Sequence, residues 1–356
     1  MMEKSTLNET KIRNARLLIS LIQSIAPISR AELAKKTSLS KPTVSAICER
    51  LFEKGFLKEI GTAESSGGKR ATLITLNNEF GVFACFDYSS WIQLKVVVID
   101  INGKELYKKS FDLEKKLVNL EEQIEKVLKE LKMIPFPFLE TRLTVRGIIS
   151  KGENKIIESL DYKMPDDFIN KIERSLNSKV KIERYSYAAC IYRWEQLGRP
   201  NDMVYVSLEE GMSLVIIKDG KIYEGVNGNA GEMTEILCPS SKGYKTLEEI
   251  LSRNEIDFSK IEQTQFENIF QPLEYLIRMV TTLLDINIVV LGGRFGEMNE
   301  RWQVELKKHI QLKKKSSRKI ELTISKRDSW DVANGSLNQT IKTYLDSKEN
   351  LSKILY

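Results

Sequence analysis

The sequence predicts an α/β protein with two unequal parts: a small winged helix-turn-helix unit at the N-terminus and a larger α/β body with two lobes. Three observations support this prediction. Residues 1–77 hold three short helical segments followed by a hairpin with a Gly-Ser loop. From residue 78 onward apolar strands dominate, and a strand–strand–hairpin phrase occurs twice. The length of 356 residues is also more than one ordinary hydrophobic core accommodates.

The first 55 residues have the spacing of three helices. Apolar residues recur at helical intervals from Lys11 to Ala26, which predicts an amphipathic helix that ends before Pro27. A second, short helix begins at the capping box Ser29-Arg30-Ala31-Glu32, where the serine hydroxyl and the glutamate satisfy end amides. A third helix is capped by Ser40 and ends at Gly55. Two close helices followed by a capped third helix are typical of a helix-turn-helix.

The third helix has an apolar side and a side with small and polar residues. Val44, Ile47, Cys48 and Leu51 form the apolar side, which we expect to pack inward. Small side chains let the other side enter a DNA major groove, where hydroxyls and amines reach base edges or phosphates. We therefore predict that this helix contacts DNA through Ser40, Lys41, Thr43, Ser45, Ala46 and Arg50.

The hairpin after the third helix has the features of a wing. Two short strands, FLKEI and ATLITL, flank the loop GTAESSGGKR, which ends in Lys69 and Arg70. Basic side chains suit the narrow, negative minor groove, so both residues are predicted DNA contacts. Residues 1–80 hold 13 Lys and Arg against 8 Glu and no Asp, a net charge of +5, and the other 276 residues hold +1. This distribution favours nucleic-acid contact. The alternative is an ordinary three-helix domain with a hairpin.

The body, residues 78–356, is predicted to have two similar lobes. GVFACFDYSS and WIQLKVVVIDINGKEL form the first phrase, with Asn102-Gly103 at the turn. MVYVSLEEG and MSLVIIKDGKIYEG form the second, with Asp219-Gly220 at the turn. Two α/β lobes with a cleft between them indicate the actin/hexokinase-like, or ribonuclease H-like, architecture. We place the lobes at roughly 78–190, together with the C-terminal helix, and 191–330.

Several kinds of site are hard to build from this composition. The four cysteines are scattered without a CxxC pair, so we expect reduced, mostly buried thiols. His309 is the only histidine, which argues against a Ser-His-Asp triad or a multi-histidine metal site. It lies in the basic tract 307–319, which we interpret as solvated surface. No apolar run approaches the length of a membrane span and the N-terminus is polar, so we expect a cytoplasmic protein without membrane contact.

Four motifs make the chain similar to the ROK family of repressors, open reading frames and kinases. The wing SSGGKRATL resembles the Ser-Ser-Gly-Gly-Arg-Arg-Pro segment of the branch with the xylose and N-acetylglucosamine repressors. KDGKIYEGVNGNAGEM resembles the family signature, in which a Gly-rich hairpin leads into Ala-Gly-Glu-Ile-Gly-His. LGGRFG and DVANGSLNQTI resemble the nucleotide-side glycine motif and the final helix. The resemblance covers nearly the whole chain and implies a sugar-kinase-like body.

Departures from the family pattern imply that the kinase machinery is lost. Family kinases begin the body with Asp-x-Gly-Gly-Thr, whose glycines let backbone amides approach ATP phosphates. This sequence has Asp87-Tyr88-Ser89-Ser90-Trp91, and we expect the bulky Tyr88 and Trp91 to obstruct that approach. Tyr185 stands where the family has its catalytic aspartate, and a phenol with a pKa near ~10 is a poor base at neutral pH. We therefore predict no catalytic residues, no enzyme activity and no cofactor.

The zinc site of the family is also missing from the sequence. Glu235 occupies the position of the zinc-binding histidine, and the three-cysteine segment has become roughly PSSKGYKT. Cys238 falls before that segment and is alone. These residues do not supply four zinc ligands, so we predict no bound metal.

The resemblance implies that part of the sugar site is retained. Glu232 and Glu248 match family positions that hydrogen-bond sugar hydroxyls, and Asp161 stands where an asparagine commonly contacts the sugar. We therefore expect a small carbohydrate effector at Asp161, Tyr185, Glu232, Glu235 and Glu248, with Tyr185 or Tyr187 stacking on its ring. The alternative is that Glu232 is kept for structural reasons and that there is no small effector.

Together these features predict a transcriptional repressor of carbohydrate-utilisation genes that a sugar-type effector controls. A homodimer or tetramer would present two recognition helices to a partly palindromic double-stranded DNA operator, about one DNA turn apart. An effector that closes the cleft would change the spacing of the two DNA-binding units. Two alternatives remain open: an active sugar kinase with a DNA-binding appendage, and a DNA-binding protein that needs no effector.

Overall fold

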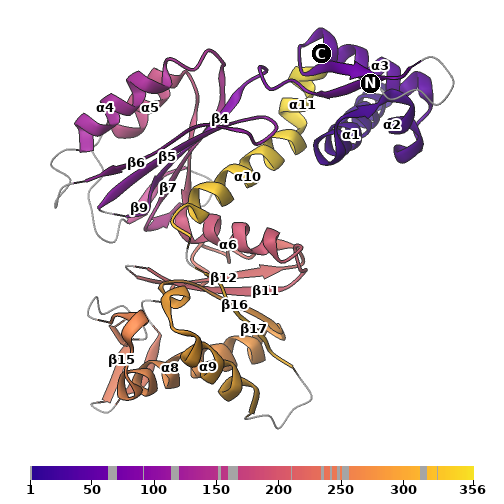
Figure 1. Ribbon diagram of the computed structural model, residues 1–356. Helices are drawn as coiled ribbons and strands as arrows, with labels where there is room; N and C mark the ends of the chain where they lie inside the picture. Colours follow the sequence, from indigo (N-terminus) through magenta and orange to yellow (C-terminus); the bar gives the residue numbers. More distant parts are fainter. Residues whose placement is uncertain are drawn as a thin grey trace.

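The computed structural model consists of three connected bodies: an N-terminal head and two α/β lobes, lobe I beside the head and lobe II below them (Figure 1). The chain returns at its C-terminus to the head, so both chain ends lie there (Figure 1). No helix in the described residues is both long and apolar enough to cross a membrane. The structure describes residues 2–62, 70–90, 92–113, 120–150, 154–158, 167–209, 211–233, 236–240, 243–246, 249–250, 256–312, 319–326 and 328–356.

The head combines three helices with a small antiparallel sheet. The helices are α1 (Met2–Ile25), α2 (Arg30–Thr37) and α3 (Lys41–Glu53). The sheet has the order β1-β3-β2 and consists of β1 (Ile28–Ser29), β2 (Leu57–Thr62) and β3 (Thr72–Leu76). The predicted winged helix-turn-helix fold is confirmed. Helix α1 begins earlier than the apolar pattern alone predicts.

The capping box at the start of α2 forms as predicted. Ser29 Oγ accepts a hydrogen bond from the Glu32 amide at 3.2 Å, and Glu32 Oε2 accepts one from the Ser29 amide at 3.0 Å. The hydrogen bonds from Ser29 lower the pKa of the Glu32 carboxyl. The ionised carboxylate therefore faces the positive end of the α2 dipole and holds the short helix in place before α3.

Lobe I is a five-stranded sheet in the order β10-β7-β4-β5-β6. Different helices pack on the two faces of this sheet. Alternate residues of β4 point to opposite faces, so they contact different helices. Val82, Ala84 and Phe86 pack under α4 (Leu120–Leu131) and α5 (Phe168–Leu176), whereas Phe83 and Cys85 face α10 (Asp331–Asp346). The strands are β4 (Val82–Tyr88), β5 (Gln93–Asp100), β6 (Glu105–Asp112), β7 (Phe138–Val145) and β10 (Val180–Arg184), and a small hairpin is formed by β8 (Ile148–Ile149) and β9 (Ile156–Glu158).

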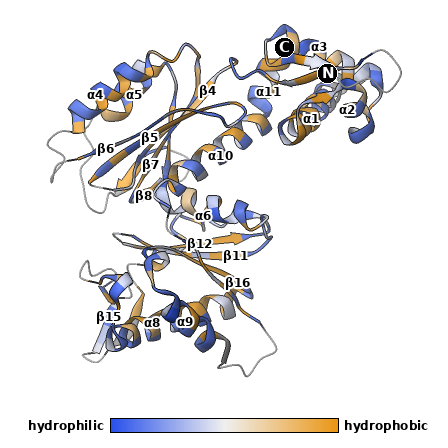
Figure 2. Ribbon diagram, in the orientation of Figure 1, coloured by the Kyte–Doolittle hydropathy of each residue, from blue (hydrophilic) through white to orange (hydrophobic). Residues whose placement is uncertain are grey.

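Lobe II repeats this arrangement with the order β13-β12-β11-β16-β17. One sheet face is covered by α8 (Gln263–Leu284) and α9 (Glu300–Leu312), and the other by α6 (Tyr185–Gln196). In Figure 2 the central strands are mostly hydrophobic and the outer sides of the covering helices are hydrophilic. The remaining elements are β11 (Met203–Leu208), β12 (Met212–Lys218), β13 (Lys221–Ile222), β14 (Leu237–Ser240), β15 (Gly243–Thr246), β16 (Ile288–Gly293), β17 (Glu321–Ile324) and the 3-10 turns η1 (Phe258–Lys260) and η2 (Arg294–Glu297). The predicted two-lobed fold is confirmed.

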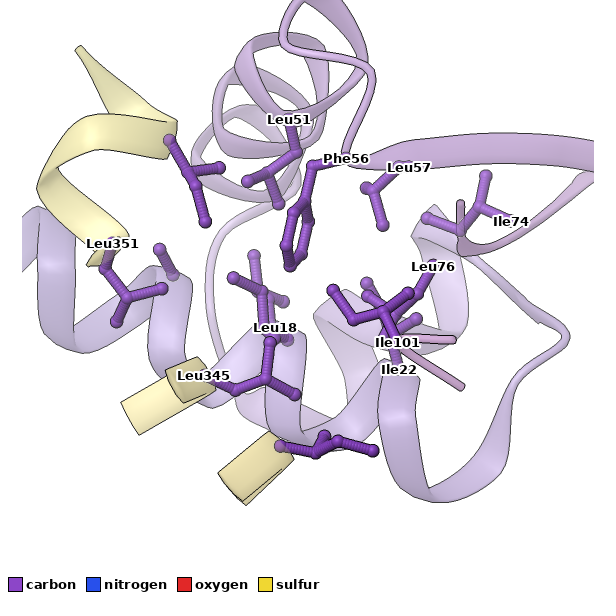
Figure 3. Close-up of a cluster of buried hydrophobic side chains, with 14 of the residues drawn as sticks. Leu18, Ile22, Leu51, Phe56, Leu57, Ile74, Leu76, Ile101, Leu345 and Leu351 are labelled. Carbon is purple, nitrogen blue, oxygen red and sulfur yellow. The ribbon is translucent and has the colours of Figure 1, made fainter. Parts of the chain in front are cut away.

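The C-terminal helices connect lobe I to the head. Helix α10 packs on the lobe I sheet, and α11 (Lys348–Leu355) continues into the head, where Leu351 lies near Leu18 and Leu51 (Figure 3). At the surface Lys348 Nζ lies 3.0 Å from Glu9 Oε1, and Tyr356 Oη donates to Asn8 Oδ1 at 3.1 Å. One apolar core therefore runs from the head through α11 and α10 into lobe I.

The thiols of Cys48, Cys85 and Cys190 are buried and unpaired. Burial raises the pKa of Cys48 to about 11 and also raises the pKa of Cys85 and Cys190. Because the thiolate is the reactive form, we expect these three side chains to resist iodoacetamide in the native protein and to react after denaturation. Mass mapping of labelled peptides measures this. Rapid labelling of Cys85 in the native protein would contradict the packing described here.

Candidate functional site

Helix α3 is fixed at its start by Ser40. The Ser40 hydroxyl accepts a hydrogen bond from the Thr43 amide at 3.2 Å and lies 2.8 Å from Thr43 Oγ1. Pro42 in the first turn lacks the amide hydrogen that would otherwise be unsatisfied there. Because its hydroxyl is already engaged, Ser40 positions the helix more than it reads bases.

The two sides of α3 separate as the sequence predicts. Val44, Ile47, Cys48 and Leu51 are buried in the head core. Of the predicted DNA contacts, three side chains are exposed and two are half-buried on the opposite side: Lys41, Ala46 and Arg50, and Thr43 and Ser45. The exposed side therefore begins with small groups and carries cations at its margins, which allows close approach of a DNA groove.

Arg30 is a basic residue beside this surface that the sequence analysis did not select. Its guanidinium lies 3.9 Å from Glu49 Oε1 of α3 and 5.3 Å from the centre of the Phe52 ring. The pair is exposed, so its contribution to stability is small. Arg30 offsets the charge of the Glu49 carboxylate, which lies in the second half of α3. The closeness of Arg30 to α3 could be found only from the packing of α2 against α3.

The wing consists of β2 and β3. Arg70 lies two residues before β3 and is exposed. Lys69 and the loop before it lie outside the described residues. The role of both basic residues in minor-groove contact stays a prediction.

A cleft lies between the two lobes, and we call it the interlobe cleft. On the lobe I side it is bounded by the residues after β7, and on the lobe II side by the start of α6, by β12 and by the turn at Gly231. Around Tyr185 and Glu232 its cavity measures about 20 Å³, which leaves room for about one water molecule. The lining residues are Arg146, Gly147, Arg184, Tyr185, Ser186, Gly211, Met212, Ser213, Leu214, Gly231 and Glu232.

Tyr185 borders the interlobe cleft from the start of α6, which packs on the lobe II sheet. Its side chain is buried, and its hydroxyl lies 3.1 Å from Ser213 Oγ of β12. Burial raises the pKa of the phenol, while the nearby Arg146 guanidinium acts in the opposite direction. A neutral phenol at this position is unsuited to deprotonate a sugar hydroxyl at neutral pH.

Glu232 lies on the lobe II side, directly after a turn that only glycine accommodates. Gly231 has a φ of +83°, and a Cβ there would lie 1.7 Å from the Leu214 carbonyl oxygen. The Glu232 amide donates to the Asn229 carbonyl at 3.1 Å, and its half-buried side chain borders the cleft. The structure therefore brings Tyr185 and Glu232 together. The other predicted sugar contacts, Asp161, Glu235 and Glu248, lie outside the described residues.

The segment that matches the phosphate loop of the kinases requires one correction. We expected Tyr88 to obstruct ATP phosphates, but its side chain is buried in the lobe I core and stacks on Phe168 with ring centres 5.9 Å apart. Successive side chains of a β-strand point to opposite faces of the sheet. Tyr88 therefore points into the lobe I core, and Asp87 points to the opposite face. Asp87 Oδ1 accepts from Thr144 Oγ1 at 2.9 Å and from the Ser89 amide at 3.1 Å. Trp91 lies outside the described residues.

The segment that matches the zinc loop of the family forms a hairpin here. Strands β14 and β15 pair in antiparallel fashion with Cys238 opposite Lys245 and Pro239 opposite Tyr244. Within the described ranges there is no group of three or more His, Cys, Asp and Glu that could hold a metal ion. Backbone pairing supports the described part of this segment.

The fold and these sites together define a class of protein: a winged helix-turn-helix head joined to a two-lobed, sugar-kinase-like body. The ROK family model matches residues 92–243, and a model described as winged helix-turn-helix DNA-binding matches residues 13–58. The chain thus contains a ROK family domain behind a winged helix-turn-helix domain, which confirms the predicted resemblance.

Proteins similar to this chain include repressors. The chain is 28% identical to the xylose repressor of Bacillus subtilis over 230 residues, covering 62% of this chain and 59% of the repressor. It is 24% identical to the xylose repressor of Lactiplantibacillus pentosus over 312 residues, covering 82% and 79%. The DNA-binding transcriptional dual regulator NagC of Escherichia coli is 23% identical over 246 residues, covering 63% and 57%. The matched region thus spans about three fifths of the Bacillus repressor.

Solved structures with the same fold include a ROK family transcriptional regulator described as a homolog of the E. coli MLC protein. It has a TM-score of 0.74 at 18% identity and covers 97% of this chain and 99% of its own. A ROK family protein from Streptococcus pneumoniae in complex with sucrose has a TM-score of 0.59 at 14% identity and covers 75% of this chain and 99% of its own. The similarity in fold to the transcriptional regulator therefore includes the head, because it covers 97% of this chain.

Proposed function

We propose that this protein is a DNA-binding transcriptional repressor of carbohydrate-utilisation genes and that a sugar-type effector in the interlobe cleft controls its affinity for DNA. The observation that carries the proposal is the exposed side of α3, with small residues at its start and cations at its margins, on a winged helix-turn-helix head. Lys69 and Arg70 supply affinity from the wing, whereas Lys41, Thr43 and Ser45 lie closest to bases.

Two heads are needed to bind a palindromic operator. We propose a homodimer or tetramer in which two copies of α3 enter successive major grooves, about 34 Å apart. A single winged helix covers only a few base pairs, so pairing two heads multiplies affinity and specificity.

The narrow space between Tyr185 and Glu232 suggests how an effector changes DNA affinity. A cavity of about 20 Å³ does not admit a sugar ring, so an effector held by both residues binds there only after the lobes part or Tyr185 turns. An effector that binds the open state alone shifts the equilibrium toward that state. The effector thus stabilises one arrangement of the lobes.

Helices α6 and α10 transmit this change toward the head. Helix α6 begins at Tyr185 and packs closely on α10, where a Cβ on Gly335 would lie 1.9 Å from the Ala188 carbonyl oxygen. Ser336 Oγ of α10 also donates to Glu183 Oε2 at 2.8 Å, directly before α6. Because α10 continues through α11 into the head core, a shift of α6 reorients the head.

The body of this proposed repressor has no kinase activity. Tyr185 replaces the base, and its buried phenol hydrogen-bonds with Ser213 instead of a substrate. We expect no ATP consumption above background with any hexose or pentose, measured with a coupled assay. Turnover that depends on a sugar would contradict this part of the proposal.

The experiment that tests effector control is a sugar titration of the protein–DNA complex, followed by fluorescence anisotropy. We expect at least one sugar or sugar derivative to release the DNA. Glu232→Gln should weaken the response to that compound by about tenfold, since it removes a charge-assisted hydrogen bond. Glu300→Gln, an exposed glutamate on α9 distant from the cleft, is the matched control. DNA binding that no compound alters would leave a DNA-binding protein without effector control.

A further inference from the structure

Arg184 is a buried cation at the interlobe cleft. Only 7% of its surface is exposed, and it lies at the junction of β10 and α6. Its Nη2 donates to the amide oxygen of Asn229 at 3.2 Å, and its Cζ lies 5.5 Å from the centre of the Tyr187 ring. Across the described ranges of the chain Arg184 forms no ion pair with a carboxylate. Burying a guanidinium costs several kcal/mol unless an anion accompanies it.

Tyr187 lies about one turn further along α6, and its hydroxyl group also lacks a partner among the described residues. Its hydroxyl oxygen is buried and makes no hydrogen bond with any described residue. A buried phenol hydroxyl without a partner also destabilises the folded protein. Among the described residues, a guanidinium without an ion-pair partner and a hydroxyl without a hydrogen-bond partner therefore lie at the same end of α6.

The interlobe cleft is lined by more cations than carboxylates, which agrees with a site for an anion beside Arg184 and Tyr187. Its lining contains Arg146 and Arg184, both buried, and one carboxylate, Glu232. Arg184 and Tyr187 also line a larger cavity of about 1200 Å³ bounded by β10, α6 and β13. A ligand group bound by Arg184 would thus lie between the interlobe cleft and this larger cavity. The larger cavity has room for a substituent of the ligand.

We propose that the effector of this protein is an anionic sugar derivative, whose carboxylate or phosphate is bound by Arg184 and the Tyr187 hydroxyl. The inference rests on the proposed function and specifies the chemical class of its ligand. Guanidinium binds both anions in bidentate fashion, and the ring hydroxyls of the sugar are left for Glu232. A neutral sugar would leave the Arg184 guanidinium buried without its counterion.

The test is isothermal titration calorimetry of the full-length protein with matched sets of sugars. Each set shares one ring: glucose, glucuronate and glucose 6-phosphate, and galactose, galacturonate and galactose 6-phosphate. We expect an anionic member to bind at least about tenfold more tightly than its neutral parent, because a charge-assisted hydrogen bond of this kind contributes ~1.5–3 kcal/mol. The uronate and phosphate arms distinguish the two anions.

Variants of Arg184 connect the preference to this residue. Arg184→Gln should abolish the preference for the anion, and Arg184→Lys should retain part of it because the charge remains. Arg199→Gln removes an exposed arginine just beyond the end of α6 and should leave the preference unchanged. The melting temperature and DNA affinity of each variant show whether it is folded.

Three outcomes would overturn the inference: neutral parents that bind as tightly as the anions, a preference that survives Arg184→Gln in a folded protein, or no binding of any anion at millimolar concentration. A neutral sugar that binds and releases DNA would overturn only this inference and would support the proposed function. Loss of DNA binding by the unmodified protein would instead contradict the proposed function.

Discussion

Replacing Ala46 by glutamate is expected to abolish specific DNA binding and to leave the fold intact. Ala46 is exposed on α3 among the small residues that we assign to the DNA face. Glutamate is a good helix former, so the helix itself should persist. Its carboxylate would meet phosphates and base acceptors, and like-charge contact costs several kcal/mol. The expected loss of affinity is therefore at least about a hundredfold.

Fluorescence anisotropy on operator DNA measures this loss, and circular dichroism checks the fold. Gln271→Glu adds the same charge at an exposed position of α8 in lobe II and should bind DNA as the unmodified protein does. An Ala46→Glu protein that is folded and retains its DNA affinity would exclude α3 as the recognition helix.

Replacing Leu351 by alanine is expected to destabilise the head by about 2–5 kcal/mol, the usual cost of opening a cavity in a packed core. Leu351 of α11 is fully buried near Leu18 of α1 and Leu51 of α3 (Figure 3). Because α11 completes the head core, DNA affinity should fall together with stability.

Urea unfolding followed by tryptophan fluorescence and circular dichroism measures the change in stability. Lys353→Ala is the control on the same helix, since Lys353 is exposed and pairs with the exposed Glu349 at 2.7 Å. Loss of this exposed ion pair should lower the free energy of unfolding by less than about 1 kcal/mol. Equal unfolding midpoints for Leu351→Ala and Lys353→Ala would show that α11 does not support the head.

Sequence patterns that span a few residues predict the structures that depend on interactions between neighbouring residues. The capping box at Ser29 and Glu32 forms because its two hydrogen bonds lie within one helical turn. The spacing of Val44, Ile47 and Leu51 determines which side of α3 is buried. The repeated strand–strand–hairpin phrase likewise predicts two lobes, and both sheets have the same strand order.

Contacts between distant segments are the parts that the sequence does not reveal. No periodicity indicates that Leu351 completes the core around Leu18, which lies more than three hundred residues away in the chain. Motif matching placed Tyr88 in a phosphate loop, but strand alternation turns it into the core. That Arg184 forms no ion pair with a carboxylate of the described residues is likewise a property of the packed cleft, since Glu183 precedes it directly in the sequence.

The most direct test of the account is fluorescence anisotropy of the full-length protein on DNA from upstream of its own gene, at two salt concentrations. The account predicts binding well above that of random DNA of equal length, and affinity that falls steeply with salt because Lys and Arg side chains displace counterions from phosphates. Binding to upstream DNA no tighter than to random DNA, together with no enriched site in a genome-wide binding screen, would contradict the assignment of a sequence-specific repressor.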